Sequence, residues 1–98
     1  MLFHVTWDYT DTSEEGERRG LQMFAAWQPP EGVDFQGFYD FVDGGGGVAI
    51  VEAADAASLA RTMYPWTPWL RFQARPILPI EESTGIGHEA MAFRDSVT

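Results

Sequence analysis

The run LFHVTWDY at residues 2–9 alternates apolar and polar side chains and is rich in β-branched and aromatic types. Alternation with a period of two is typical of a β-strand that buries one face. The odd-numbered side chains Phe3, Val5 and Trp7 are apolar and are expected to face the core. The even-numbered side chains between them are polar and are expected to face the other way: His4, Thr6 and Asp8.

A second alternating run, LRFQARPI at residues 70–77, predicts the last strand of the same sheet. Its polar side chains are Arg71, Gln73 and Arg75. If the two strands are antiparallel neighbours, their apolar side chains share the face that helices cover, and their polar side chains share the other face. On that second face Arg71 is expected near Asp8, and His4 near Arg75.

The segment after the first strand predicts a helix. Thr12 followed by Glu15 is a capping-box signature, and two prolines follow the expected end of the helix at about Trp27. Its apolar stripe contains Leu21, Phe24 and Trp27. Small residues one turn apart are expected to let this helix approach the sheet closely: Gly16 and Gly20.

Two further strands and a second helix complete the pattern. Residues 33–42 and 48–53 are interpreted as strands, and residues 43–47, Asp-Gly-Gly-Gly-Gly, as the hairpin turn between them. Asp55 is expected to cap the second helix, and Pro65 to end it. The buried stripe of this helix is expected to contain Ala56, Leu59, Ala60 and Met63.

The element order β-α-β-β-α-β is the split βαβ pattern. It predicts an α+β, ferredoxin-like fold: a four-stranded antiparallel sheet in the order 4-1-3-2, with two helices on one face. We expect one domain over residues 1–80 and a C-terminal tail over residues 81–98. The tail is expected to carry a short helix that docks on the body or on a second subunit, because four apolar residues share one face: Ile86, Ala90, Phe93 and Val97.

Composition narrows the classes of function. The 98 residues include fifteen acidic residues, six arginines and no lysine, for a formal charge of −9. Such a field repels phosphate backbones and anionic lipid, so binding to nucleic acid or to a membrane surface is disfavoured. No run approaches the roughly 18 apolar residues of a membrane span, and a basic signal-peptide head is missing, so we expect a cytoplasmic protein.

Aromatic residues are dense, with seven Phe, four Trp and three Tyr. A domain of this size cannot easily bury fourteen rings in one core, so some are expected to line a cavity or a subunit interface. The predicted ring-lined, substrate-binding set is Phe38, Tyr39, Tyr64, Trp66 and Trp69. Packing in the core or at a dimer interface is the competing interpretation for these rings. Trp7 and Trp27 lie on core-facing stripes and are expected in the core.

The polar face offers a second candidate site. His4 is a candidate general acid or base, and Arg71 or Arg75 a candidate stabiliser of a developing oxyanion. Thr6 and Gln73 lie between them and are expected to contact a substrate. The structural alternative is an ordinary cross-strand ion pair between Arg71 and Asp8, with His4 as a hydrogen-bonded interface residue.

Other chemistries have little support in the sequence. The chain contains no cysteine, which removes disulfides, thiolate nucleophiles and zinc–thiolate sites. His4 and His88 are the only histidines, and no carboxylate spacing matches a metal-binding loop, so we expect neither a metal site nor a cofactor. The glycine run lacks the strand–helix context of a nucleotide-binding loop and is interpreted as a turn.

Several motifs resemble one known family. They are the opening MLFxV, the PxGV at residues 30–33, the Asp-Gly-Gly hairpin, and the WxxWLxFxxxP run at residues 66–76. Together they are similar to the bacterial proteins grouped as domain of unknown function 3303, over roughly residues 1–80. This resemblance implies a dimeric α+β barrel, in which two four-stranded sheets face each other. The wider group includes cofactor-free monooxygenases, isomerases, haem-degrading proteins and members without a known reaction.

These observations lead to one functional expectation and two alternatives. We expect a homodimer that binds a small apolar or aromatic molecule, with cofactor-independent isomerisation, cyclisation or oxygenation as candidate reactions. The first alternative is a non-catalytic dimeric interaction protein, whose rings serve assembly only. The second is haem binding, which a Soret band of the purified protein would reveal.

Overall fold

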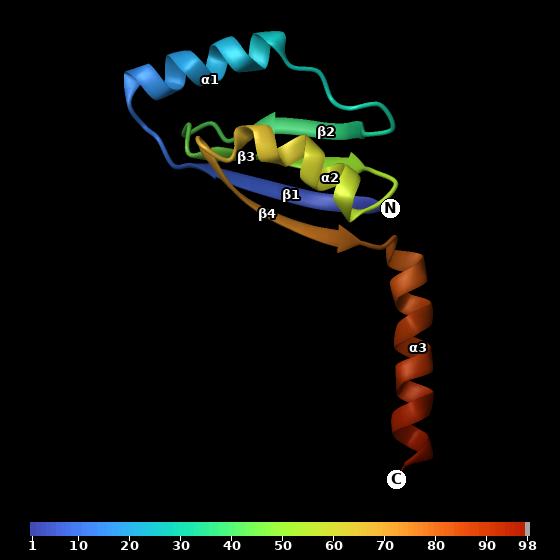
Figure 1. The fold of residues 1–98 in the computed structure, drawn as a ribbon. Coiled ribbons are helices and arrows are strands. Elements are labelled where there is room, and N and C mark those ends of the chain that lie inside the picture. Colours follow the sequence, from blue (N-terminus) through green and yellow to red (C-terminus); the bar gives the residue numbers. More distant parts are fainter. Residues whose placement is uncertain (98) are drawn as a thin grey trace.

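The structure, a computed structural model, describes residues 1–97. Its elements follow the predicted order, and the fold is of the ferredoxin-like α+β class (Figure 1). The elements are β1 (Leu2–Tyr9), α1 (Glu14–Ala26), β2 (Asp34–Asp40), β3 (Gly46–Glu52), α2 (Ala56–Met63), the short 3-10 helix η1 (Tyr64–Trp66), β4 (Leu70–Ile77) and α3 (Ile80–Ser96).

The four strands form one antiparallel sheet in the order β2-β3-β1-β4, which confirms the predicted order. β1 therefore pairs on one side with β3 and on the other with β4. The glycine run is divided between turn and strand, because β3 begins at Gly46 and the turn ends two residues earlier than predicted. Trp7 faces Gly47 across the β1–β3 pair.

A bulge in β2 changes which side chains face the helices. Phe35 lies opposite Val51, and Phe38 lies opposite Ala49. The two phenylalanines are three positions apart along β2, whereas their partners are only two positions apart along β3. The register shift between Phe35 and Gly37 accommodates the additional residue. Regular alternation would have turned the two phenyl rings to opposite faces, whereas the bulge brings both to the covered face.

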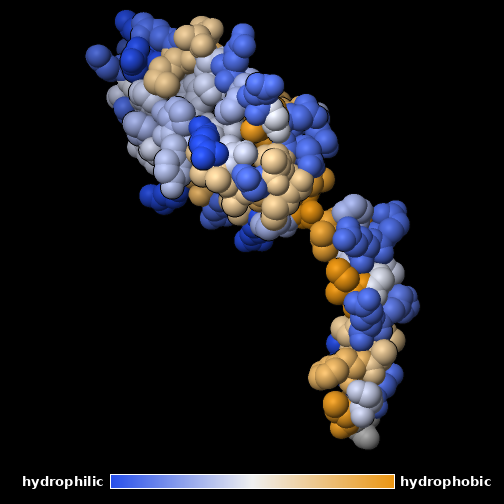
Figure 2. Space-filling model, turned by 45° about the vertical axis from the view of Figure 1, so that its right-hand side comes forward, coloured by the Kyte–Doolittle hydropathy of each residue, from blue (hydrophilic) through white to orange (hydrophobic). Residues whose placement is uncertain are grey.

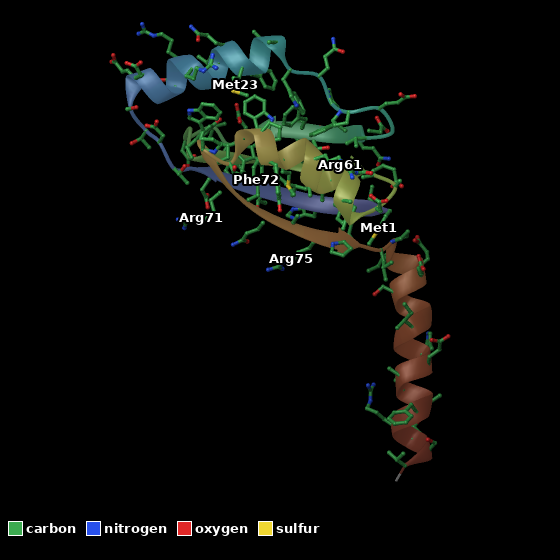
Figure 3. The ribbon with its side chains drawn as sticks, in the orientation of Figure 1. Met1, Met23, Arg61, Arg71, Phe72 and Arg75 are labelled. Carbon is green, nitrogen blue, oxygen red and sulfur yellow. The ribbon has the colours of Figure 1, made fainter. Side chains whose placement is uncertain are left out.

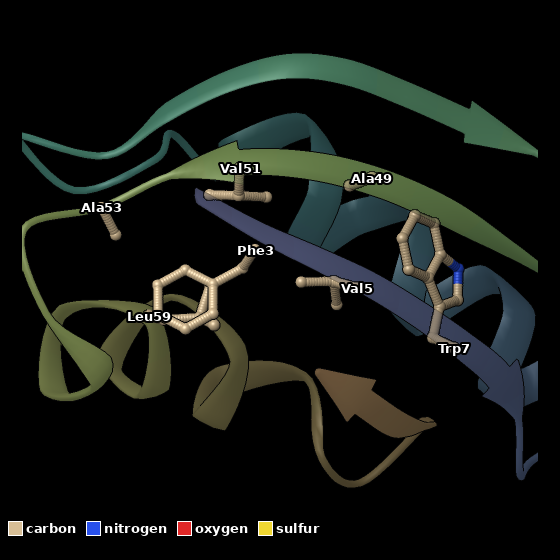
Figure 4. Close-up of a cluster of buried hydrophobic side chains, with 7 residues drawn as sticks. All are labelled: Phe3, Val5, Trp7, Ala49, Val51, Ala53 and Leu59. Atoms are coloured by element: carbon tan, nitrogen blue, oxygen red, sulfur yellow. The ribbon is translucent and has the colours of Figure 1, made fainter. Parts of the chain in front are cut away.

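The core lies between the sheet and α2. Its buried members come from β1, β3 and the start of α2, with Leu59 of α2 packed over Phe3 (Figure 4). Phe3, Val5 and Trp7 of β1 are all buried, as the alternation predicted. Each such side chain contributes about 1.5–3 kcal/mol through removal of its apolar surface from water. The cluster is Phe3, Val5, Trp7, Ala49, Val51, Ala53 and Leu59.

Two helix starts are capped by side chains. Asp55 accepts a hydrogen bond from the Ser58 amide at 2.8 Å, which confirms the predicted cap of α2. At α1 the prediction was wrong by one residue: Ser13, and not Thr12, is the N-cap, and its Oγ accepts from the Gly16 amide at 3.0 Å. Asp11 fixes this serine by accepting from both its amide and its hydroxyl group. Both bonds lower the pKa of the Asp11 carboxyl group, and the bond from the hydroxyl group has the larger effect.

α1 stands off the sheet above β2, and only its side chains reach the strands (Figure 1). The expectation that Gly16 and Gly20 permit close approach is therefore wrong. A Cβ at Gly20 would meet no atom within 4 Å, and one at Gly16 would meet the Asp11 carboxylate instead of the sheet. Gly16 makes room for the capping group of its own helix.

α3 extends away from the rest of the chain (Figure 1). It is longer than the short helix predicted for the tail, and it begins at Ile80. Large apolar side chains are exposed along it (Figure 2): Ile80, Ile86, Met91, Phe93 and Val97. Thr98, the last residue of the predicted tail, lies outside the described residues. Within residues 1–97, no helix combines the length and the apolar character that a membrane span requires.

Candidate functional site

The predicted polar side chains gather on the open face of the sheet. His4 lies opposite Arg75, Thr6 opposite Gln73, and Asp8 opposite Arg71 in the β1–β4 register. Directly opposed residues of antiparallel strands point to the same side. In Figure 3 the side chains of Arg71 and Arg75 point away from α2, whereas Phe72 lies on the side of the helices.

No helix of residues 1–97 covers this face, so its polar groups are open to water (Figure 1). Arg71, Gln73 and Arg75 are exposed, and His4 and Thr6 are half-buried. Asp8 and Arg71 are cross-strand neighbours, yet no ion pair joins them among the described residues. The arginines are therefore free to contact a ligand or a second subunit, but one chain alone provides no enclosed space around His4.

A large cleft occupies the opposite face, between the sheet, α1 and η1. Its volume is about 720 Å³, and its lining is mainly aromatic. The side nearest α1 and β2 is formed by Phe24 of α1, by Trp27 directly after this helix, and by Phe35 and Phe38 of β2. The rings of Phe35 and Phe38 have centroids 4.8 Å apart, and the Trp27 ring packs edge-on against Phe35 at 5.8 Å. These contacts are the means by which α1 holds to the sheet.

The rest of the cleft is formed by rings from β1, η1 and the start of β4. Trp66 packs edge-on against Trp27 at 5.6 Å and lies 6.1 Å from Phe24. Trp69 continues the network from Trp66, and Trp7 joins Phe38 to Phe72 on the floor. Eight rings of the described chain, including all four tryptophans, thus form one continuous aromatic lining.

The aromatic loop between α2 and β4 is held by local hydrogen bonds. Pro65 stands at the start of η1, and Thr67 closes the turn by donating from its amide and its hydroxyl group to the Tyr64 carbonyl. The Trp69 carbonyl accepts from the Thr10 amide at 2.8 Å, which ties the loop to the end of β1. Trp66 and Trp69 are thereby held in position beside the cleft and are both half-buried.

Polar groups of the cleft lie mainly near its acidic end. The Tyr9 hydroxyl group donates to Oδ1 of Asp40 over 3.4 Å. Partial burial, followed by the negative charge of Asp40, raises the pKa of the Tyr9 phenol above its usual value. Asp11 and Glu17 line the same cleft. The buried Thr62 hydroxyl group is satisfied, because it donates to the Ser58 carbonyl at 3.0 Å.

The structure places the two sets of candidate residues that the sequence suggested, one aromatic and one polar, on opposite faces of the sheet. Phe38, Trp66 and Trp69 line the cleft. The five polar candidates His4, Thr6, Arg71, Gln73 and Arg75 lie on the other face of the same sheet. A four-stranded sheet therefore stands between the proposed acid–base group and the aromatic pocket.

Of the other two predicted rings, one lies outside the cleft and one only borders it. Tyr64 is 72% exposed and does not line the cleft. Tyr39 borders the cleft, but its register partner is Val48 on the open face, and its ring is 68% exposed. Consecutive residues of a strand face opposite sides, so Phe38 and Tyr39 cannot both project into one cleft.

The sequence interpretation also missed part of the lining. Phe35 and Phe72 line the cleft, and Phe24 and Trp27 contribute rings that had been placed on a core-facing stripe. Trp7 is only 7% exposed and joins both the core and the floor of the cleft. In a regular strand, residues three positions apart face opposite sides, so the spacing of Phe35 and Phe38 argued against a shared face. The bulge between them turns both rings to one face, and the local sequence pattern gives no sign of it. Within residues 1–97, no three His, Asp or Glu side chains are grouped as metal ligands.

Comparison with known proteins identifies the family of the chain. A family model described as Domain of unknown function (DUF3303) matches residues 1–91. The match extends through most of α3 and so beyond residue 80, where the resemblance read from motifs ended. No curated protein and no solved structure is significantly similar to the chain.

Proposed function

The chain belongs to the DUF3303 family, and we propose that it binds a small apolar or aromatic molecule in the ring-lined cleft between α1 and the sheet. The observation that carries this proposal is the size and the lining of the cleft, about 720 Å³ with rings from five elements. Sites for small molecules commonly have volumes of about 300–1,000 Å³ and mainly apolar walls with a few polar groups.

The exposure of the surrounding side chains supports a binding site over a packed core. Leu21 and Phe24 on α1 are 63% and 50% exposed, although they border the cleft. A finished core is packed about as densely as an organic crystal and leaves few voids. A ligand in the cleft would take this apolar surface out of water and would add contacts between α1 and the sheet.

We further propose that two copies associate through the open faces of their sheets. This face carries apolar side chains among the polar ones, including Leu2, Val48 and Ile50, and no helix of the same chain covers it. A layer of sheet that buries only one face leaves the other available for a second layer. The two sheets would then enclose His4, Arg71 and Arg75 in a shared space.

A cofactor-independent reaction, such as an isomerisation, a cyclisation or an oxygenation, would need a proton-transfer group next to the ligand. His4 is separated from the cleft by the sheet, so any catalysis by His4, Arg71 and Arg75 belongs to the space between two subunits. The other candidate function is non-catalytic assembly, in which the rings and exposed faces serve only contacts between proteins. The open sheet face and the exposed side chains of α3 favour that alternative.

The experiment compares two aromatic residues of the same short helix. Trp66 lines the cleft, and Tyr64, two residues earlier, is exposed outside it. We expect Trp66→Ala to weaken binding of the neutral probe N-phenyl-1-naphthylamine about tenfold or more, because a buried aromatic contact is lost. Tyr64→Ala is the control and is expected to stay within about twofold of the unmodified chain.

Fluorescence titration of the probe measures both affinities. Native mass spectrometry of the protein from the expression host would identify a retained molecule directly. Equal probe affinity for the unmodified chain and for Trp66→Ala would rule out the cleft as the binding site.

A further inference from the structure

The charged side chains that line the cleft are all acidic. Asp11, Glu17 and Asp40 contribute to its wall, whereas none of the six arginines and neither histidine does so. An aromatic cavity whose charged groups have one sign discriminates between ligands by their charge. In the proposed binding site, these three carboxylates are the charged groups of the wall.

The acidic residues lie together at one end, where β1 leads into α1. Tyr9 connects them: its hydroxyl group bonds to Asp40, and the charge of Glu17 contributes to the raised pKa of its phenol. Asp11 packs against Gly16, the residue before Glu17. The other part of the lining, around Trp27, Phe35 and Trp66, is rich in aromatic rings and contributes no charged side chain.

The three carboxylates differ in what they already bind. Asp11 accepts two hydrogen bonds from Ser13 and offsets the positive end of the α1 dipole, so its charge is used within the chain. Asp40 accepts one long hydrogen bond, 3.4 Å, from the Tyr9 hydroxyl group, and Glu17 lies in the first turn of α1. Among residues 1–97, no basic side chain neutralises either carboxylate in an ion pair. These two carboxylates are therefore available to a ligand cation at the mouth of the cleft.

The aromatic rings of the cleft also attract cations, as the carboxylates do. The face of an indole or phenyl ring carries partial negative charge and attracts an ammonium group within about 6 Å, most strongly when water is excluded. The aromatic lining reaches the acidic end, because Trp7 adjoins Tyr9 along β1 and packs on Phe38. A carboxylate or a phosphate ester would meet ring faces and acids at every approach and would find no cationic partner.

From these observations we propose that the cleft selects a monocationic molecule with an aromatic or bulky apolar body, such as an arylalkylamine. Its rings insert beside Trp27 and Trp66, and its ammonium group lies between Glu17 and Asp40. This inference rests on the proposed function, since it specifies the ligand class of the same cleft.

The test uses three probes that share one naphthalene body and differ in charge. They are 1-naphthylmethylamine, which is an ammonium ion at pH 7, the neutral 1-naphthylmethanol and the anionic 1-naphthylacetate. Isothermal titration calorimetry of the full chain measures the three affinities. We expect the ammonium probe to bind about tenfold more tightly than the alcohol, and the acetate more weakly than either. The preference is expected to shrink as salt is raised, because the acids are partly exposed.

Matched double variants locate the source of the preference. Glu17→Gln with Asp40→Asn removes the two available carboxylates, and the ratio between ammonium and alcohol affinity is expected to fall below about twofold. Glu15→Gln with Asp34→Asn removes the same net charge from α1 and β2 outside the cleft and is expected to keep the ratio.

The outcomes separate the two proposals. Binding of the alcohol as tightly as the ammonium probe, or tighter binding of the acetate, overturns the cationic ligand and leaves the aromatic pocket in place. An equal loss of preference in both double variants attributes the effect to net charge and also overturns it. Failure of all three probes to bind overturns the proposed function itself, and the ligand class with it.

Discussion

At the scale of single residues, contact with an aromatic side chain explains why position 47 is a glycine. A Cβ at this position would lie 2.3 Å from Cζ2 of Trp7 and 2.4 Å from the Tyr39 carbonyl oxygen. The Trp7 indole therefore covers the backbone of β3 where its Gly47 lies opposite Trp7. The glycine permits the Trp7 ring to pack directly on the backbone of β3 in the floor of the cleft.

Alanine substitutions at two glycines are expected to have opposite effects on stability. Gly47→Ala should lower the free energy of unfolding by about 1–3 kcal/mol, because the methyl group overpacks against Trp7. Gly20→Ala should raise it by up to about 1 kcal/mol, since a methyl group there meets no neighbouring atom and alanine favours the helix. Urea denaturation of the two variants measures both changes. A loss of stability in Gly20→Ala would show that α1 lies closer to the sheet than described.

At the scale of elements, only a few side chains hold α1 in its position. Its backbone does not pack on the sheet, so its position depends on the Phe24 and Trp27 rings and on the cap at its start. Elements with few buried contacts open more readily than the core. α1 is thus suited to move when a molecule enters the cleft beneath it.

The cap of α1 provides a sharp comparison between neighbouring residues. Ser13→Ala removes the acceptor of the Gly16 amide and should lower the free energy of unfolding by about 1 kcal/mol. Thr12→Ala, one residue earlier, should change it by less than about 0.5 kcal/mol, because threonine is not the capping residue in the structure. Chemical denaturation followed by tryptophan fluorescence is the measurement. A larger loss for Thr12→Ala would restore the start of the helix that the capping box predicted.

At the scale of the whole molecule, α3 extends away from the body, and no other element packs extensively against it among residues 1–97. α3 has 17 residues, little more than the roughly 12–15 below which an isolated helix is marginal in water even when it is rich in alanine. Gly85 and Gly87 within it each cost about 1 kcal/mol relative to alanine. The helix projects from the body with apolar side chains exposed (Figure 2). We expect a second copy of the chain to supply the missing contacts, in keeping with the proposed dimer.

Charged substitutions on the shared stripe of α3 test this expectation in the full chain. Ile86→Glu with Phe93→Glu should weaken the dimer about tenfold or more, because two apolar side chains would carry charge into the contact. His88→Glu, which points to another side of the same helix, is the control and should leave association unchanged. Sedimentation equilibrium gives the dissociation constants, and circular dichroism verifies helix content. A monomeric unmodified chain at micromolar concentration would exclude the dimer, and an unaltered double variant would exclude α3 from it.

The sequence alone determined the order of the elements, the bounds of β4 and the pairing of Arg71 with Asp8 and of Arg75 with His4. The bounds follow from a side-chain period of two, which is a local property, and the pairing follows from the strand order that the β-α-β-β-α-β pattern implies. Only the tertiary structure decided that the polar and aromatic candidates occupy opposite faces, that Phe35 and Phe38 share one face, and that α1 stands off the sheet. The cleft forms where side chains from four distant elements come together: β1, α1, β2 and η1. Their positions depend on the bulge in β2 and on the orientation of α1. Both depend on packing between segments, which no local pattern encodes.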